Sequence, residues 1–217
     1  LNLCELLGCE PYVSANLGSG TVEEMAAWVE YMTSPADSPL ANLRRENGRD
    51  KPWKVTYLGV GNESWGCGGN MRPEFYAYQY RRYATYCRNF GDNRLFKIAL
   101  GPSDFDVNWT EVMMKNVGRR MDGLSVHFYT VYNWNAKGSA TKFTPDDYYW
   151  TLGKCLDIDN VIKSHSAVMD RTDPDKRISL MVDEWGTWWD EEPGTVRGHL
   201  YQQNTLRDAF VAALSLM

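Results

Sequence analysis

Histidine and cysteine are scarce in this sequence, and neither is arranged as a metal-binding motif. The 217 residues include three histidines and five cysteines. The histidines, His127, His165 and His199, are scattered along the chain. No H-E-x-x-H or C-x-x-C spacing occurs. An odd number of cysteines predicts free, mostly buried thiols rather than a disulfide framework. The sequence therefore predicts no metal site.

The loops that bind nucleotide cofactors are also missing. No predicted strand is followed by G-x-G-x-x-G, and the glycine-rich segment 66–69 lacks the Lys-Ser/Thr pair of a P-loop. A G-x-S-x-G elbow is absent, which argues against a serine hydrolase. No apolar run approaches the roughly 18 residues that a membrane-spanning helix needs. We therefore expect neither a cofactor nor a membrane partner.

The overall composition is that of one folded, mildly acidic domain. The chain is 43% hydrophobic and 24% charged, which provides for one sizeable core and argues against disorder. Its formal net charge of −5 gives no reason to expect a nucleic-acid partner. The 9 Trp and 13 Tyr slightly favour a carbohydrate ligand, because aromatic faces stack on sugar rings, although aromatics also fill cores.

Five short apolar segments are predicted as buried parallel strands, and each is followed by a helical pattern. The strands are 11–16, 55–61, 96–100, 123–129 and 178–184. Thr21 and Glu24 form a capping box that opens a helix to about residue 32, and Pro73 precedes a helix over 74–90. Further helices are expected over 109–117, 149–169 and 199–217. Such alternation predicts a parallel sheet with crossover helices, either open or closed into a barrel.

The polar residues at the strand ends favour the barrel. They follow all five strands at their carboxyl ends: Asn16, Asn62, Glu63, Ser103, Asp104, His127, Tyr129, Asp183 and Glu184. Active sites of (β/α)8 barrels are assembled at that edge from several strands. The connection 131–147 follows Tyr129 on the same side, so it could shape a substrate cleft. Five units cannot close a barrel, and both ends of the sequence read as helices cut short. We therefore expect one domain over 1–217, an incomplete (β/α)8 TIM barrel.

Two strand-end glutamates are the candidates for catalysis. Glu63 follows Asn62 at the end of the second predicted strand, and Glu184 ends the fifth, before Trp185, Trp188 and Trp189. Either glutamate alone could equally be an exposed strand-end residue. As a pair, they lie three strands apart and so face each other across a barrel. Glycoside hydrolysis needs such a pair, about 5–5.5 Å apart for retention and roughly 6.5–9.5 Å for inversion.

His127 and Tyr129 are the next candidates. They differ by two positions on one strand, so their side chains point to the same side. Tyr129 could hydrogen-bond the nucleophilic glutamate, and His127 could orient a carboxylate or a sugar hydroxyl. The alternative is a hydrogen-bonded core histidine beside a tyrosine that only packs.

These motifs together resemble glycoside hydrolase family 51, the α-L-arabinofuranosidases. The resemblance is carried by segments 10–20, 61–63 (Gly-Asn-Glu), 126–129 (Val-His-Phe-Tyr), 183–185 (Asp-Glu-Trp) with Trp188, and 206–213. It implies that Glu63, after barrel strand four, is the acid/base and that Glu184, after strand seven, is the nucleophile. It further implies that Asn62 and Tyr129 contact the sugar or the nucleophile, and that Trp188 lines the sugar subsite.

The family cleaves terminal α-L-arabinofuranosyl groups from arabinan or arabinoxylan with retention, and it needs no metal. Members often form hexamers, so a homo-oligomer is possible here. The chain corresponds to about strands 3 to 7, without the family's first two strands, last strand and C-terminal β-sandwich. An endo-acting glucanase or xylanase of the same barrel clan, or a non-catalytic carbohydrate-binding protein, stays open as an alternative. The compartment is undetermined, with a cytoplasmic location favoured over a secreted one.

Overall fold

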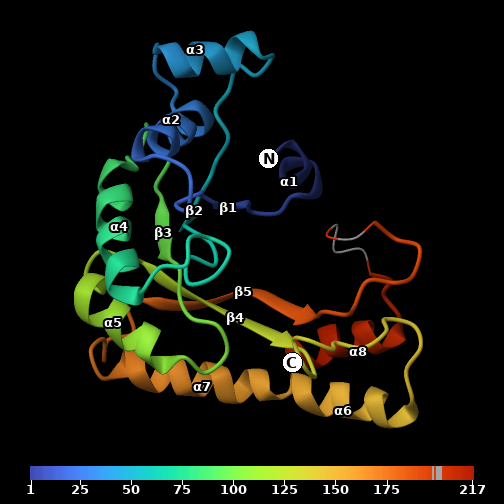
Figure 1. Cartoon of the computed structure of the whole chain (residues 1–217). Helices are drawn as coiled ribbons and strands as arrows, with labels where there is room; N and C mark the ends of the chain where they lie inside the picture. The colour runs from blue at the N-terminus through green and yellow to red at the C-terminus, as the bar shows by residue number, and fades with distance from the viewer. Residues whose placement is uncertain (197, 199–201) are drawn as a thin grey trace.

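The computed structural model describes residues 1–196, 198 and 202–217 and contains a five-stranded parallel sheet in the order β1-β2-β3-β4-β5. The strands are β1 (Tyr12–Ser14), β2 (Tyr57–Val60), β3 (Phe96–Ala99), β4 (Gly123–Thr130) and β5 (Ser179–Thr187). Each strand pairs with the next one along the chain in parallel register. The sheet curves into a half-barrel, which confirms the predicted incomplete barrel (Figure 1).

Helices cover the outer side of this half-barrel, with α4, α5 and α7 packed behind the strands (Figure 1). In chain order the helices are α1 (Asn2–Leu7), α2 (Val22–Thr33), α3 (Pro39–Glu46), α4 (Pro73–Tyr86), α5 (Val107–Val117), α6 (Pro145–Cys155), α7 (Asp157–Asp170) and α8 (Leu206–Ser215). None of the helices in the described part of the chain has the length and apolar character that a membrane crossing needs.

The predicted helix starts are confirmed where a cap defines them. Thr21 and Glu24 form the full capping box of α2, and Pro73 is the first residue of α4. Helix α4 ends at Tyr86 rather than at residue 90. Of the helix predicted over 199–217, α8 accounts for Leu206–Ser215, whereas His199 lies outside the described residues.

Two helix predictions were wrong. The single helix predicted over 149–169 is two helices, α6 and α7, which meet at Leu156. The two helices have different neighbours on either side of this break: α6 packs against α8 and β4, whereas α7 packs against α5 and β5. Helix α3 was missed: no element was predicted between the helix that ends near residue 32 and the strand that begins at 55. It is short, and its buried residues are Ala41 and Arg44, whose guanidinium donates to backbone carbonyls, so no set of large apolar side chains marks it in the sequence.

The cysteine prediction was correct in part. All five are free, but only Cys87 and Cys155 are buried, while Cys9 and Cys67 are exposed. Cys9 follows the Gly8 cap that ends α1, and Cys67 lies in the turn after Glu63, so both belong to surface turns rather than to the core.

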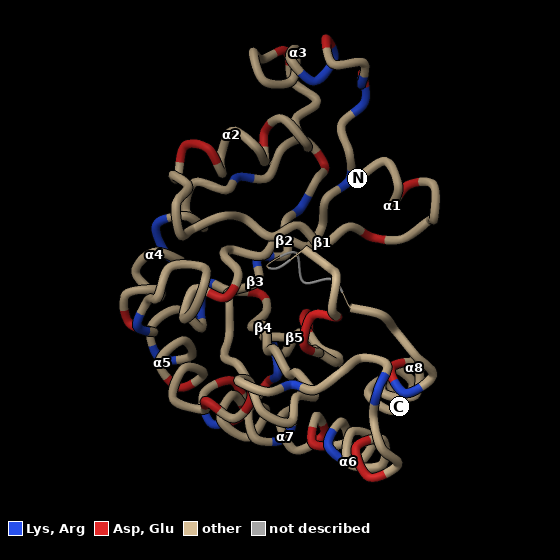
Figure 2. The backbone as a smooth tube through the Cα atoms, turned by 45° about the vertical axis from the view of Figure 1, so that its right-hand side comes forward, with Lys and Arg blue, Asp and Glu red and all other residues tan. Residues whose placement is uncertain are grey.

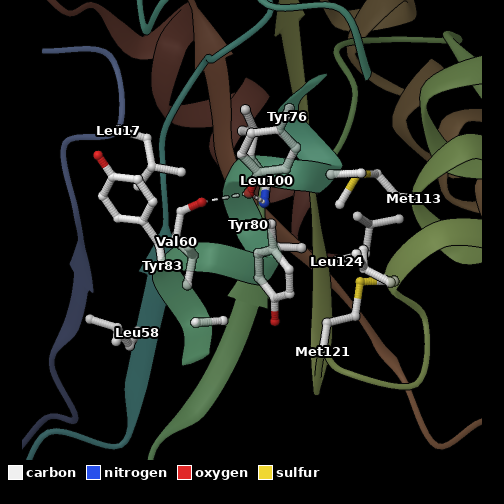
Figure 3. Close-up of a cluster of buried hydrophobic side chains, with 14 of the residues drawn as sticks. Leu17, Leu58, Val60, Tyr76, Tyr80, Tyr83, Leu100, Met113, Met121 and Leu124 are labelled. Atoms are coloured by element: carbon white, nitrogen blue, oxygen red, sulfur yellow. Dashed lines mark hydrogen bonds between the residues drawn. The ribbon is translucent and has the colours of Figure 1, made fainter. Parts of the chain in front are cut away.

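The core lies between the sheet and helices α4 and α5, and Tyr76 holds two strand ends together inside it (Figure 3). Its hydroxyl donates to the Val60 carbonyl at the end of β2 and accepts from the Leu100 backbone N–H after β3, at 2.6 Å for the latter. Tyr76 is fully buried, and burial raises the pKa of its hydroxyl well above the ordinary value. The neutral phenol therefore fixes the two strand ends immediately before the site described below.

Replacing Tyr76 by Phe should lower the free energy of unfolding by about 1–3 kcal/mol, because the Val60 carbonyl and the Leu100 N–H lose their common partner in the core. Chemical denaturation of the protein measures this loss. Tyr78→Phe is the matched control, since Tyr78 lies on the same helix with 71% of its surface exposed and should change stability little. Equal stability of the two variants would contradict the bridging role of Tyr76.

Candidate active site

Glu63 is presented by a tight turn that follows β2. Its φ of +44° is in the left-handed region, which is uncommon for a residue with a side chain. The turn is closed by the backbone N–H groups of Gly66 and Gly68, which donate to the Glu63 carbonyl at 2.8 and 2.9 Å. A Cβ on Gly68 would lie 1.9 Å from the Asn62 carbonyl oxygen, so this turn requires glycine. The strained backbone is held at a candidate catalytic carboxylate, as is common in active sites.

A β-bulge presents the second carboxylate. Val126 pairs with Val182, but the next residue, His127, pairs with Glu184, so that Asp183 is the extra residue in β5. In a regular strand the side chains of Asp183 and Glu184 would point to opposite faces. With the bulge, both carboxylates contact the same imidazole, that of His127.

His127 lies between the two candidate glutamates. Its Nδ1 is 3.3 Å from Glu63 Oε1 and 3.4 Å from Glu184 Oε2. One carboxylate oxygen of each glutamate and a ring nitrogen of His127 all lie within 4.8 Å of one another. Strands β3 and β4 separate the two glutamates in the sheet, so the curvature of the half-barrel brings these distant residues together.

Glu184 receives hydrogen bonds from two neutral donors. The Tyr129 hydroxyl donates to its Oε1 at 2.6 Å, and the Asn62 amide lies 3.5 Å from its Oε2. Burial, together with the adjacent Glu184 carboxylate, raises the pKa of Tyr129 well above the ordinary value, so the phenol stays protonated as a donor. Glu63 accepts from the Cys67 thiol at 3.0 Å. This hydrogen bond is the main reason why the pKa of the Cys67 thiol is raised.

His127 itself is buried, with the side chain 1% exposed. Burial works against a charge on the ring, but the surrounding carboxylates outweigh it, Asp183 first, so that the pKa of His127 lies above its ordinary value. The ring Nε2 is 3.2 Å from Asp183 Oδ1. This contact is at ion-pair distance but not aligned as a hydrogen bond, and neither atom has another partner among the described residues.

The same three side chains, Glu63, His127 and Glu184, are the group in the described part of the chain with spacing suited to a metal ion. A metal would need the neutral imidazole as ligand, whereas the raised pKa of His127 favours the protonated ring. Glu184 and Glu63 also already accept from Tyr129 and Cys67. The donor set therefore fits a proton-sharing cluster better than a cation site.

Aromatic rings extend from this cluster toward the connection 131–147. The centroid of the Trp188 ring lies 5.3 Å from that of Tyr129, and the Trp134 ring lies 5.7 Å from Trp188 and 6.1 Å from Tyr129. Trp134 is 51% exposed, so part of its surface is open to a ligand. Acidic residues are frequent at and after the end of β5, where the backbone is red in Figure 2.

The structure brings five of the six sequence-predicted site residues into one cluster, and Trp188 adjoins it through Tyr129. The other strand-end polar residues are placed differently. The Asn16 side chain donates a hydrogen bond to nearby Ser19. The Asp104 backbone N–H donates to the backbone carbonyl of His127 and not to its ring. His165 is a structural histidine, bonded to Thr110 and to the Asp104 carbonyl.

Three residues near the site were not predicted from the sequence. Tyr12 donates to Asp183 Oδ2 at 2.7 Å, Cys67 bonds Glu63, and Trp134 joins the aromatic group. Cys67 and Trp134 lie in a turn and a loop, where no regular pattern predicts which way a side chain points. Tyr12 offered one signal, because it alternates with Ser14 and Asn16 on a strand already expected to face the barrel interior.

Known proteins that are similar to this chain share one activity in their names. Residues 1–145 match the family model described as the alpha-L-arabinofuranosidase 1 domain. The chain is 72% identical, over its whole length, to an intracellular exo-alpha-L-arabinofuranosidase of Bacteroides ovatus, of which it covers 42%. It is 29% identical to the probable alpha-L-arabinofuranosidase C of Aspergillus niger, of which it covers 44%.

Solved structures of arabinofuranosidases also match this chain. The GH51 arabinofuranosidase from Xanthomonas axonopodis pv. citri matches 98% of this chain with a TM-score of 0.94 and 52% identity. An alpha-L-arabinofuranosidase from Thermotoga maritima matches 99% with a TM-score of 0.80 and 26% identity. The chain covers 43% and 41% of these proteins, so it spans about two fifths of the relatives that it matches. On the family model and these likenesses, the chain belongs to the family 51 α-L-arabinofuranosidases.

Proposed function

We propose that this chain supplies both catalytic carboxylates of a retaining α-L-arabinofuranosidase, with Glu63 as acid/base and Glu184 as nucleophile. The observation that carries the proposal is the convergence of the two carboxylates on His127, with an oxygen of each within 4.8 Å of the other. Oxygens this close favour the short carboxyl separation of retaining enzymes, about 5–5.5 Å, over the roughly 6.5–9.5 Å of inverting enzymes.

The surroundings of the two carboxylates support the division of roles. Glu184 accepts from Tyr129 and lies beside the Asn62 amide, and these two donors hold its carboxylate in one orientation for attack. Glu63 has the Cys67 thiol on one oxygen and His127 beside the other. The Glu63 side chain is 17% exposed, so a bound substrate can still reach its carboxyl group.

The reaction then proceeds by double displacement. Glu184 attacks the anomeric carbon while Glu63 gives its proton to the glycosidic oxygen, which leaves as an alcohol. The sugar is now held as an ester on Glu184. Glu63, ionised, takes a proton from water, and the resulting hydroxide oxygen displaces Glu184 from the anomeric carbon. Both glutamates end in the protonation states in which they began.

The sugar subsite is assigned to the rings beside Glu184. Trp188, packed on Tyr129, provides an apolar face for the arabinofuranose ring, and Asn62 provides an amide for a hydroxyl group. His127 is enclosed, and both its ring nitrogens face carboxylates. It therefore orients carboxylates rather than a sugar hydroxyl.

For the whole protein we propose removal of terminal α-L-arabinofuranosyl groups from arabinan- or arabinoxylan-type glycans. The Bacteroides ovatus relative is named as an exo-acting, intracellular enzyme, and its 72% identity supports the same action and location here. Residues 1–217 would form part of the (β/α)8 catalytic domain, completed by strands outside this chain. The assembled protein would form a homo-oligomer, as its family suggests. Hydrolysis of aryl cellobiosides or xylobiosides in preference to aryl arabinofuranosides would support the endo-acting alternative instead.

Substitution of the two glutamates in the complete enzyme tests their roles. Glu184→Ala should lower kcat by about 10⁴-fold or more on every substrate, because no covalent intermediate forms. Glu63→Ala should lower it by about 10²–10⁴-fold on polysaccharide but far less in the first step on an aryl arabinofuranoside, whose leaving group needs no proton. Steady-state and burst kinetics on both substrates measure this difference. Glu74→Ala, which removes an exposed carboxylate of α4, is the control. Near-normal activity of Glu184→Ala on polysaccharide would refute the assignment.

A second test concerns metal dependence. We expect prolonged dialysis against EDTA to leave kcat/KM within about twofold, because the cluster of Glu63, His127 and Glu184 works through protons and charges of its own. Activity that is lost on dialysis and restored by a divalent cation would instead make these three residues a metal site.

A further inference from the structure

The buried carboxylate of Asp183 has no part in the reaction proposed above, although it lies within contact distance of the catalytic cluster. Its side chain is 8% exposed. Oδ1 faces His127 Nε2 at 3.2 Å, and Oδ2 accepts from the Tyr12 hydroxyl at 2.7 Å. Burial of a carboxylate costs free energy unless charges or donors compensate for it, so this placement requires an explanation.

The backbone is shaped to bring Asp183 to this position. The bulge between Val126 and His127 makes Asp183 the extra residue of β5 and turns it toward the face that Glu184 occupies. The sheet thus departs from regular pairing at the residue that contacts His127. Bulges next to active sites commonly re-aim a side chain in this way.

Tyr12 reaches Asp183 by crossing β2 at Gly59. A Cβ on Gly59 would lie 2.9 Å from the Tyr12 hydroxyl and 2.8 Å from Ser14 Oγ, so a side chain there would displace the tyrosine. Burial and the Asp183 charge raise the pKa of Tyr12 well above its ordinary value, so the hydroxyl remains a donor. Residues of β1, β2 and β5 therefore combine to hold one carboxylate oxygen in place.

The charges that face His127 come from several elements. Asp183 and Glu184 belong to β5, and Glu63 follows β2. Asp104, which follows β3, also interacts with the ring charge, although Lys154 of α6 acts on it more strongly. Tyr129, on the same strand as His127, contributes a neutral hydroxyl. No cation among the described residues forms an ion pair with any of these carboxylates apart from His127 itself. The ring is thus the one positive charge in contact with the acidic cluster in the described part of the chain.

We propose that Asp183 is a positioning residue, whose carboxylate keeps the His127 imidazole charged so that a single Nδ1–H serves Glu184 and Glu63 in turn. This inference rests on the catalytic roles proposed above. Nδ1 hydrogen-bonds Glu63 at 3.3 Å and lies 3.4 Å from Glu184 at ion-pair distance, so a small rotation of the ring or of Glu184 brings the same N–H to the second carboxylate.

The two halves of the reaction need this alternation. Before the first step Glu63 holds its proton and Glu184 is ionised, so the positive ring stabilises the nucleophile. After the first step Glu184 is a neutral ester and Glu63 is ionised, so the ring stabilises the base. One ionised glutamate is present in each half, and His127 keeps its proton throughout. Asp183 balances the ring charge from the opposite side, as the buried aspartate of a catalytic triad does for its histidine.

Asp183→Asn tests the inference in the complete enzyme, because it keeps the shape of the side chain and removes its charge. Without the Asp183 charge the His127 ring, which the proposal requires to be protonated, loses its proton at lower pH. The alkaline limb of kcat/KM against pH should therefore move to lower pH by about one unit, with an aryl α-L-arabinofuranoside as substrate. The ratio of wild-type to variant kcat/KM should consequently rise about tenfold from the acidic to the alkaline end, with KM nearly unchanged.

Two further variants serve as a control and as a second test. Asp159→Asn is the control: it removes the charge of a side chain on α7 that is 63% exposed. It should leave the alkaline limb of kcat/KM unchanged. Tyr12→Phe, which frees Asp183 to turn away from His127, should move the limb in the same direction by a smaller amount. If Asp183→Asn fails to fold, Tyr12→Phe still tests the inference. The melting temperature of each variant shows whether it is folded.

An alkaline limb that stays in place in folded Asp183→Asn, with activity lowered equally at every pH, would overturn the inference and leave Asp183 a purely structural residue. A limb that moves to higher pH would overturn it as well. Failure of the proposed function looks different: the wild-type enzyme would not hydrolyse the aryl arabinofuranoside, or Glu184→Ala would remain active.

Discussion

The contact of one imidazole nitrogen with two carboxylates is the interaction on which the site depends. His127 Nδ1 lies 3.3 Å from Glu63 and 3.4 Å from Glu184, although the two glutamates belong to opposite sides of the half-barrel. Two carboxylates this close repel each other when both are ionised. A buried positive ring between them reduces that repulsion, so the contact with His127 allows the two carboxylates to lie this close.

The fold supports this contact at several points. Tyr76 ties the ends of β2 and β3 together, immediately before the turn that carries Glu63. That turn holds Glu63 at a φ of +44°, and the bulge in β5 aims Asp183 and Glu184 at the same ring. Neither arrangement is the regular form of a strand end. Both are departures from local preference that a surrounding core must stabilise, and they occur where the carboxylates converge.

Much of the fold could be predicted from the sequence, because each strand is a short apolar run and its helix carries a recognisable start. Asn62, Glu63, His127, Tyr129 and Glu184 were found for a related reason: strand ends of a parallel barrel share one edge. The contribution of Asp183 could not be predicted, since alternation places it on the face opposite Glu184 and only a bulge reverses that. The break between α6 and α7 was missed because the two helices pack against different neighbours. The apolar periodicity within one segment does not indicate which elements the segment will contact.

The most direct test of the account is the stereochemistry of transfer. When the complete enzyme cleaves an aryl α-L-arabinofuranoside in aqueous methanol, proton NMR of the early products identifies the methyl arabinofuranoside formed. Carboxylate oxygens within 4.8 Å of each other predict two successive displacements at the anomeric carbon, and hence the methyl α-L-arabinofuranoside. Formation of the β anomer, or of free arabinose alone with inversion, would contradict the assignment of Glu184 as nucleophile.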